Sequence, residues 1–430
     1  MSQHQILIDR ARALQKDLVE LASALVRIPT VNPYSADSTA GCELAGQQFI
    51  ADLFKKEFGA SVTLSEPPPD IFERAKVRGP KNRSWKNRPN AIARITIGSG
   101  RGKTIVLNNH MDTVGAEGME IDPFSGKVED GKIWGRGTSD TKGNTAVGIT
   151  ALRALLESPL AKECDGTILF QSVVDEECNG SGAGTMWACL EGHTGDLAIC
   201  LDGTSAPQIG CNGILTYDIR VKGRSGHSSR GGSVNAIDKG VYIKQAIDRF
   251  RDQRERKDRT ARVGIGVFRS GTIPAMIPGE ALLGLNINYL CAEAAEAERG
   301  GQGWSGALVD AEFKTFIAEA AAADEFLKSH PPELSVVKDV YPYATPADHP
   351  LVRLACAALS QIHGSEVKPC VMEAWGDAGH LSRLGKMPTI GFGSTTPGYA
   401  HAAVECTDIE DLVKGASALT IVLYELLKKN

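Results

Sequence analysis

The hydrophobic pattern divides the chain into segments of helical and of strand periodicity. Leu14, Leu18, Leu21 and Leu25 recur at helical spacing and predict a helix that ends at residues 28–29. A second helix is predicted over residues 42–58. Strands are predicted at 61–64, 91–97, 104–107, 167–174 and 196–201. Two more helices are predicted at 141–156 and 182–189. This alternation predicts an α/β fold with a three-layer catalytic domain and a mostly parallel central sheet.

The pattern changes after Gly213. Strands are predicted at 214–221, 263–268, 281–290 and 334–340, and helices at 235–251 and 310–328. Their order, β-α-β-β-α-β, is typical of a ferredoxin-like α+β sandwich. We therefore expect a lid or dimerisation domain at 213–344, inserted into a metal-binding catalytic domain formed by residues 1–212 and 345–430.

Two segments show neither periodicity. Residues 66–89 hold three consecutive prolines and seven basic side chains, which predicts a solvated surface loop. A role in steering an anionic substrate is the alternative. Residues 299–306 read R-G-G-Q-G-W-S-G and predict a flexible loop without an assigned role.

Composition narrows the class of protein. The 430 residues are 42% hydrophobic and 23% charged, which is typical of a soluble enzyme with two or three domains. A net charge of −5 gives no sign of a nucleic-acid partner. No apolar run approaches the ~20 residues that span a bilayer, and the N-terminus does not resemble a signal peptide. The ten cysteines form no C-x-x-C pair, so we expect free thiols and a cytoplasmic protein.

The stretch L-N-N-H-M-D-T-V ends a predicted strand with two polar side chains. His110 and Asp112 are two residues apart, so they face the same side of an extended chain. The carboxyl end of a strand in an open α/β sheet is where ligands bind. His110 is therefore a candidate metal ligand, with Asp112 as the carboxylate that orients it. The two residues alone fit a buried His–Asp hydrogen bond equally well.

Other acidic groups follow predicted strands or begin a predicted helix. Asp140 precedes the helix at 141–156, where a metal ligand or a helix N-cap is possible. Asp175, Glu176 and Glu177 follow a strand and would repel one another unless a cation compensates them, the alternative being a solvated acidic corner. Asp202 follows the next strand.

Together with His401, these residues predict a mixed nitrogen and oxygen site for one or two divalent ions per subunit. Zinc is the preferred ion, and manganese or cobalt are the alternatives. The chain contains no G-x-S-x-G and no H-E-x-x-H motif.

Six motifs stand in a familiar order: N-H-M-D-T-V, G-R-G-T-S-D-T-K-G, D-E-E, L-D-G-T, S-G-H-S-S and P-G-Y-A-H. In these motifs the chain resembles the dinuclear-metal amidohydrolases and peptidases of the acetylornithine deacetylase, succinyl-diaminopimelate desuccinylase, aminoacylase and carboxypeptidase G type. The resemblance implies that Asp140 bridges two metal ions. It further implies that His110 and Asp202 complete one ligand set, and that Glu177 and His401 complete the other.

The resemblance also implies the catalytic groups. Glu176 would be the general base and later the acid, and Asp112 would hold His110. His227, in the predicted lid, would reach a neighbouring subunit's active site and polarise the substrate carbonyl.

Three departures from the family pattern concern the substrate. Ala275-Met276-Ile277-Pro278 stands where many members carry Asn-Val-Ile-Pro, and residues 286–288 read N-I-N in place of D-x-R. Near the C-terminus the segment W-G-D-A-G-H supplies Trp375 and His380. We take Met276, Trp375 and His380 as candidate substrate contacts, and expect a flatter or more apolar substrate than an acyl amino acid.

The predicted function is that of a metal-dependent hydrolase cleaving an amide C–N bond in a small N-acylated or peptide-like substrate. One alternative is an aminohydrolase that removes an amino group from an activated aromatic ring, such as an aminobenzoate or nitroanthranilate. Another is a catalytically inactive metal-binding homologue. We expect a homodimer or higher homo-oligomer formed through residues 213–344, because exposed edge strands invite pairing with a second copy.

Overall fold

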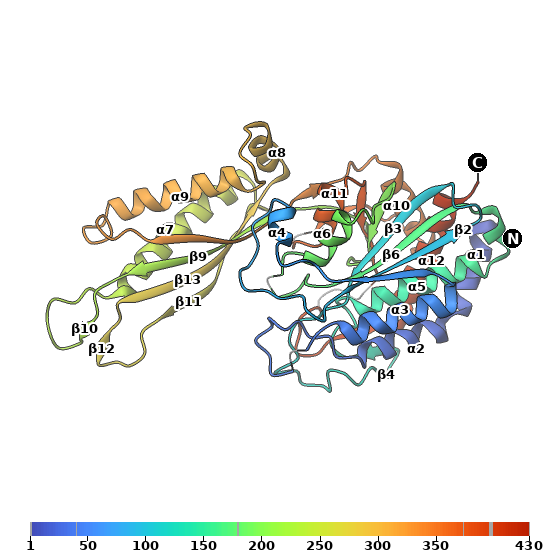
Figure 1. The fold of residues 1–430 in the computed structure, drawn as a ribbon, viewed down its shortest axis with the longest axis horizontal. Helices are drawn as coiled ribbons and strands as arrows, with labels where there is room; N and C mark the ends of the chain where they lie inside the picture. Colours follow the sequence, from blue (N-terminus) through green and yellow to red (C-terminus); the bar gives the residue numbers. More distant parts are fainter. Residues whose placement is uncertain (1, 40, 179, 373, 395–398, 430) are drawn as a thin grey trace.

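The computed structural model describes residues 2–39, 41–178, 180–372, 374–394 and 399–429. A larger part is built on a nine-stranded sheet, and a smaller part with a four-stranded sheet projects from it (Figure 1). Both termini lie at the end of the larger part that is remote from this projection. Within the described residues, no helix combines the length and the apolar character needed to cross a membrane.

The nine-stranded sheet is parallel at its centre. Its order is β1-β2-β6-β3-β7-β17-β8-β15, and β16 pairs with β8. The parallel centre consists of β6 (Gly166–Val173), β3 (Lys103–His110), β7 (Leu197–Cys200) and β17 (Thr389–Gly391). The flanking strands are β1 (Ser61–Ser65), β2 (Asn90–Ile97), β8 (Gln208–Cys211), β15 (Tyr343–Ala344) and β16 (Cys370–Met372). The predicted mostly parallel sheet is thus confirmed.

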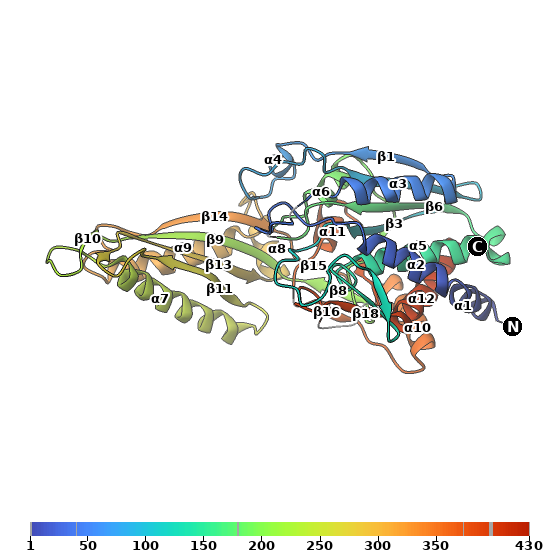
Figure 2. The ribbon, with the colours of Figure 1, turned by 90° about the horizontal axis from the view of Figure 1, so that it is seen from below.

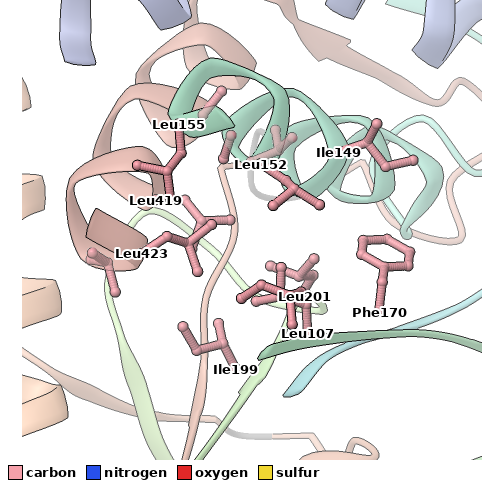
Figure 3. Packing of buried hydrophobic residues seen from close by; sticks show 14 of the residues in the cluster. Leu107, Ile149, Leu152, Leu155, Phe170, Ile199, Leu201, Leu419 and Leu423 are labelled. Carbon is pink, nitrogen blue, oxygen red and sulfur yellow. The ribbon is translucent and has the colours of Figure 1, made fainter. Parts of the chain in front are cut away.

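Helices cover both faces of this sheet. Successive side chains of a strand point to opposite faces. Leu107 and Phe170 therefore meet α5 (Lys142–Leu156) and α12 (Ile409–Leu427) on one face (Figure 3). Val106, one residue earlier in β3, lies in the core on the other face. That face is covered by α6 (Ala183–Leu190) and α11 (Ala378–Arg383). The face of α5 and α12 also carries α3 (Leu44–Phe58) and α10 (Pro350–His363). The three-layer prediction is confirmed.

The small sheet is antiparallel, in the order β11-β13-β9-β14. Its strands are β9 (Gly213–Lys222), β11 (Val263–Ser270), β13 (Glu280–Tyr289) and β14 (Glu333–Val340). Helices α7 (Ala236–Lys257) and α9 (Ala307–Ala322) bury one of its faces. The short strands β10 (Gly226–His227) and β12 (Met276–Ile277) pair with each other at the tip farthest from the large sheet (Figure 1), and Figure 2 shows β10 at the same tip. The chain order confirms the ferredoxin-like prediction, whereas the boundaries at 213 and 344 stay a prediction.

Several predicted elements differ in extent. The first helix is two helices, α1 (Gln3–Ala13) and α2 (Gln15–Val26), which meet at Leu14; α1 packs mainly on α12 and α2 mainly on α5. Helix α7 continues to Lys257, because the buried Arg254 is ion-paired with Glu293 and Glu312. Helix α8 (Cys291–Arg299) was not predicted.

The prediction that segment 66–89 is a solvated loop is wrong in part: five of its seven basic side chains are exposed, but several of its apolar residues and Arg88 are buried. The segment contains the short helix α4 (Ile71–Arg74), and it buries Ile71 and Trp85 against residues of α6. The remaining short elements are β4 (Lys127–Glu129), β5 (Lys132–Trp134), β18 (Cys406–Asp408) and the 3₁₀ helix η1 (Pro159–Glu163).

Candidate metal centre

Three central strands deliver polar side chains to one edge of the large sheet. Strand β3 ends at His110, which pairs with Val173 at the end of β6. The acidic run after β6 and Asp202 after β7 therefore begin at the same edge, because parallel strands end on the same side. This arrangement agrees with the expectation that separate strands bring these side chains to one edge of the sheet, whereas their roles stay a prediction.

Two groups of possible metal ligands share one aspartate. Among the described residues, His110, Asp140 and Asp202 offer ligand atoms that all lie within 4.8 Å of one another. Asp140, Glu177 and His401 do the same. One oxygen of Asp140 lies 3.1 Å from Nε2 of His110, and the other lies 3.3 Å from Nε2 of His401. Ligand atoms around a tetrahedral zinc are about 3.3 Å apart, so this donor set fits a pair of ions.

The site concentrates negative charge. Burial raises the pKa of Glu177 to about 7, and the charge of Asp140 adds to this effect. Burial and the same neighbour raise the pKa of Asp202 to about 6. Burial likewise raises the pKa of Glu176 well above its ordinary value, with Glu177 and Asp202 contributing. Such repulsion among acids is relieved when a cation binds between them.

The surrounding carboxylates raise the pKa values of both histidines. Hydrogen bonds to Asp140 and Glu177 raise the pKa of His401 to about 10. Burial alone would lower the pKa of His110, but Asp140 and the other carboxylates outweigh it and raise that pKa well above 6.5. Each imidazole thus presents Nε2 to carboxylates, which is the arrangement that a divalent ion would replace with direct coordination.

Asp112 orients His110 through its main chain. Nδ1 of His110 donates to the main-chain oxygen of Asp112 at 2.9 Å, whereas the carboxylate oxygen is 3.8 Å away. This contact orients the ring so that Nε2, the candidate ligand atom, faces Asp140. The Asp112 carboxylate instead accepts hydrogen bonds from the main-chain N–H groups of Glu176 and Glu177 and from the side chain of Asn32.

Asp140 is held by groups that the sequence patterns did not single out. The N-cap alternative for Asp140 is wrong, because Thr141 is the N-cap of α5 and the Asp140 carboxylate faces the two histidines. Glu405 accepts hydrogen bonds from the N–H groups of Ser139 and Asp140, and its other oxygen is ion-paired with Arg136. Arg136 lies within the motif G-R-G-T-S-D-T-K-G, and Glu405 follows the motif P-G-Y-A-H by four residues. Their proximity to these motifs could have identified them as candidate site residues.

Asp175 is compensated by arginines, not by solvent. It has no exposed surface, and one of its oxygens lies 2.7 Å from Arg83 and 3.1 Å from Arg88. Arg88 is also bidentate to the buried Glu43. The solvated acidic corner considered for residues 175–177 is therefore wrong. Arg83 and Arg88 belong to the segment 66–89, so two of its seven basic side chains compensate a buried acid, whereas the other five are exposed.

The catalytic candidate His227 and the candidate substrate contacts lie in two different places. His227 and Met276 pair across β10 and β12 at the exposed tip of the small sheet, far from the metal centre of the same chain. Trp375 and His380 are buried near Asp377: Nε1 of Trp375 donates to the Tyr341 carbonyl, and Nε2 of His380 donates to the Ser181 carbonyl.

His380 is 0% exposed, and burial lowers its pKa to about 4, so it is a neutral interior group in this conformation. Direct contact of His380 with a substrate would require the surrounding segment to move. Asp377, which was noted only as part of the W-G-D-A-G-H segment, is also buried, and burial raises its pKa to about 7.

Comparison with known proteins places this geometry in context. The sequence model of peptidase family M20/M25/M40 matches residues 106–425. An N-formyl-4-amino-5-aminomethyl-2-methylpyrimidine deformylase of Halalkalibacterium halodurans is 27% identical, with 96% of this chain and 94% of the relative covered. A succinyl-diaminopimelate desuccinylase of Methylorubrum extorquens is 32% identical over 48% of this chain and 50% of its own. A solved dipeptidase of Saccharomyces cerevisiae shares the fold, with a TM-score of 0.74, 15% identity and 99% of both chains covered.

Proposed function

The chain belongs to peptidase family M20/M25/M40, and from this membership we propose how its metal centre works and on what it acts. The resemblance inferred from the six motifs is confirmed. The protein is an enzyme, a divalent-metal-dependent hydrolase of amide bonds. The observation that carries the proposed mechanism is the position of Asp140 between the two groups of ligands.

In the proposed site, Asp140 would be a ligand shared by two ions. His110 and Asp202 would complete the ligands of the first ion, and Glu177 and His401 would complete those of the second. Zinc is the ion we propose, because imidazole and carboxylate ligands suit it, although manganese and cobalt accept the same donors. When bound, such a pair polarises the scissile carbonyl and lowers the pKa of a water molecule.

Glu176 is the proposed proton carrier. Its main chain is fixed by the Asp112 carboxylate, and its side chain is half-buried beside the ligand Glu177. It accepts the proton of the attacking water and then donates it to the leaving nitrogen. Burial raises the pKa of Glu176, whereas bound cations would lower it, so these two opposing influences set how readily the carboxylate takes up and returns a proton.

The proposed substrate is a short N-acyl amine, such as a formamide, carried on a flat aromatic ring. The relative that aligns over nearly the whole chain is named for removal of a formyl group from an aminomethylpyrimidine. This chain also lacks the family's lid asparagine and arginine that hold a substrate carboxylate, and carries Ala275 and Asn288 there. No specific observation favours aromatic deamination over amide hydrolysis.

A substrate panel tests this proposal. N-formyl and N-acetyl derivatives of arylmethylamines are expected to release acid and amine in equal amounts. Their kcat/KM should exceed that of N-acetyl amino acids by about tenfold or more. Ammonia release from aminobenzoates in the same panel measures the alternative reaction. A preference for N-acetyl amino acids would contradict the substrate class, and ammonia as the main product would contradict the reaction.

We further propose a homodimer formed through the lid, residues 213–344. Phe268 on the edge strand β11 is 42% exposed, and Ile273 is 59% exposed. Phe268 borders Gly240 of α7, and Ile237 and Val241 on the same helix are also exposed. An apolar patch beside a free strand edge is suited to pairing with a second copy, which would bring His227 to the other subunit's metal centre.

The substitution Phe268→Asp is expected to convert the dimer into a monomer, because a charge then replaces apolar contact at the edge. Light scattering coupled to gel filtration measures the mass, and kcat/KM should fall with dimer content if His227 acts across the interface. Leu64→Asp, at an exposed apolar position on β1, is the matched control and should stay dimeric. A wild-type monomer that is fully active would reject the proposal.

A cytoplasmic location is proposed from the thiols. All ten cysteines are free, and five of them are buried. Burial raises the pKa of Cys189 to about 12, which keeps that thiol protonated and unreactive. Free, inert thiols in this number are typical of proteins in a reducing compartment.

A further inference from the structure

The loop after β6, which the structure describes over residues 175–178 and 180–182 (loop 175–182), carries both Glu176 and Glu177 and has an unusual backbone in its described part. It connects β6 to α6, and Asp175 and Cys178 have φ values of +68° and +57°. Non-glycine residues rarely adopt these angles unless surrounding groups hold them there. Internal hydrogen bonds from Gly180 to the Glu177 carbonyl and from Gly182 to the Asp175 carbonyl close the loop on itself. The side chains that contact this loop from other segments therefore help to set the position of Glu176.

Arg83 holds this loop at two points. Its side chain is 5% exposed, and Nη1 lies 2.7 Å from the Asp175 carboxylate. Nη2 donates to the main-chain carbonyl of Cys178 at 2.7 Å. The guanidinium also lies over the ring of Tyr34, at 4.2 Å from its centroid. A guanidinium fork can serve both acceptors at once, which a lysine ammonium at the same place cannot do with the same geometry.

Arg88 has a different task in the same cluster. It forms a bidentate pair with Glu43. Its contact with loop 175–182 is to the side-chain carboxylate of Asp175, not to the main chain. The two arginines and two acids together are electrically neutral. Charge compensation of Asp175 is therefore shared between Arg83 and Arg88, whereas the grip on the main chain at Cys178 comes from Arg83.

A second cation holds the loop from the side of the small sheet. Lys338, near the end of β14, is 7% exposed and donates from Nζ to the Gly180 carbonyl at 3.0 Å. The next residue, Asp339, donates its N–H to the carbonyl of Arg78. Arg78 in turn lies over Trp304 of the glycine-rich segment 299–306. The basic segment thus lies between the base of the lid and the loop that carries Glu176.

We propose that Arg83 and Lys338 are positioning residues that hold loop 175–182 so that the Glu176 carboxylate stays at reacting distance. The inference rests on the proposed role of Glu176 as the base. It assigns a role to the basic segment 66–89, and it makes a lid strand part of the support of the base. A displacement of about 1 Å in a catalytic group can lower the rate about 10²-fold, so this support acts on turnover.

Arg83→Lys tests the proposal because it keeps the charge and removes the fork. We expect kcat to fall about 10- to 100-fold with KM changed less than twofold and with the metal content of the wild type. Lys338→Met should lower kcat in the same way. Lys86→Met, at an exposed basic position of the same segment, is the control and should behave as the wild type.

Hydrogen exchange of the metal-loaded enzyme gives a readout that does not depend on activity. The amides of Glu176 and Glu177 are bonded to the Asp112 carboxylate, and their exchange should quicken in Arg83→Lys. Unchanged kcat and exchange in both variants would overturn the inference, and so would a loss of kcat that only follows lost metal or lost folded protein. An active Glu176→Gln enzyme would instead overturn the proposed base.

Discussion

Replacing Glu176 by glutamine is expected to lower kcat about 10²- to 10⁴-fold while leaving the metal content unchanged. The amide has the shape of the carboxylate but cannot take a proton from water or return one to the leaving nitrogen. Glu176 belongs to neither group of possible ligands that contain Asp140. Its substitution should therefore affect the chemical step without emptying the site.

The measurement pairs steady-state kinetics with elemental analysis of the dialysed protein. The exposed Glu319 on α9 provides a matched control, since Glu319→Gln makes the same change in the small sheet's helical layer and should leave kcat as it is. If Glu176→Gln retained wild-type turnover, another group would have to be the base. If it lost metal together with activity, Glu176 would be a ligand and the assignment of Glu177 would need revision.

The parts of the site that the sequence predicted are those carried by strand ends. His110, Glu177 and Asp202 follow apolar runs whose length and composition predict parallel strands. Parallel strands share an edge, so the approach of these side chains follows from topology once the fold class is known.

The supporting contacts could not be predicted because they join segments that are remote in sequence. Arg83 and Asp175 are 92 positions apart, and nothing in the local pattern of residues 66–89 indicates a buried acid that needs compensation. Charge runs are usually solvated, and that general expectation produced an assignment that is wrong in part here. Similarly, the extension of α7 to Lys257 depends on Arg254 meeting acids from α8 and α9.

Removing the shared carboxylate should have the largest effect on metal binding. Asp140→Asn keeps the size of the side chain but removes the charge and one of the two oxygens that face His110 and His401. Both proposed ions lose a ligand, so we expect metal content to fall from two ions to fewer than one per subunit, and activity to fall to background. His401→Ala removes a ligand from only one of the two groups, so the metal content of this variant should fall by a single ion.

Elemental analysis after dialysis, followed by calorimetric titration with zinc, distinguishes these outcomes. Asp218→Asn, on the exposed face of the small sheet, is the matched control and should keep both ions. The comparison is informative because Asp140 and His401 contact each other, so a general loosening of the site would affect both variants alike. Two ions retained in Asp140→Asn would show that the two groups of ligands do not depend on a common carboxylate, and the proposed bridged arrangement would then be rejected.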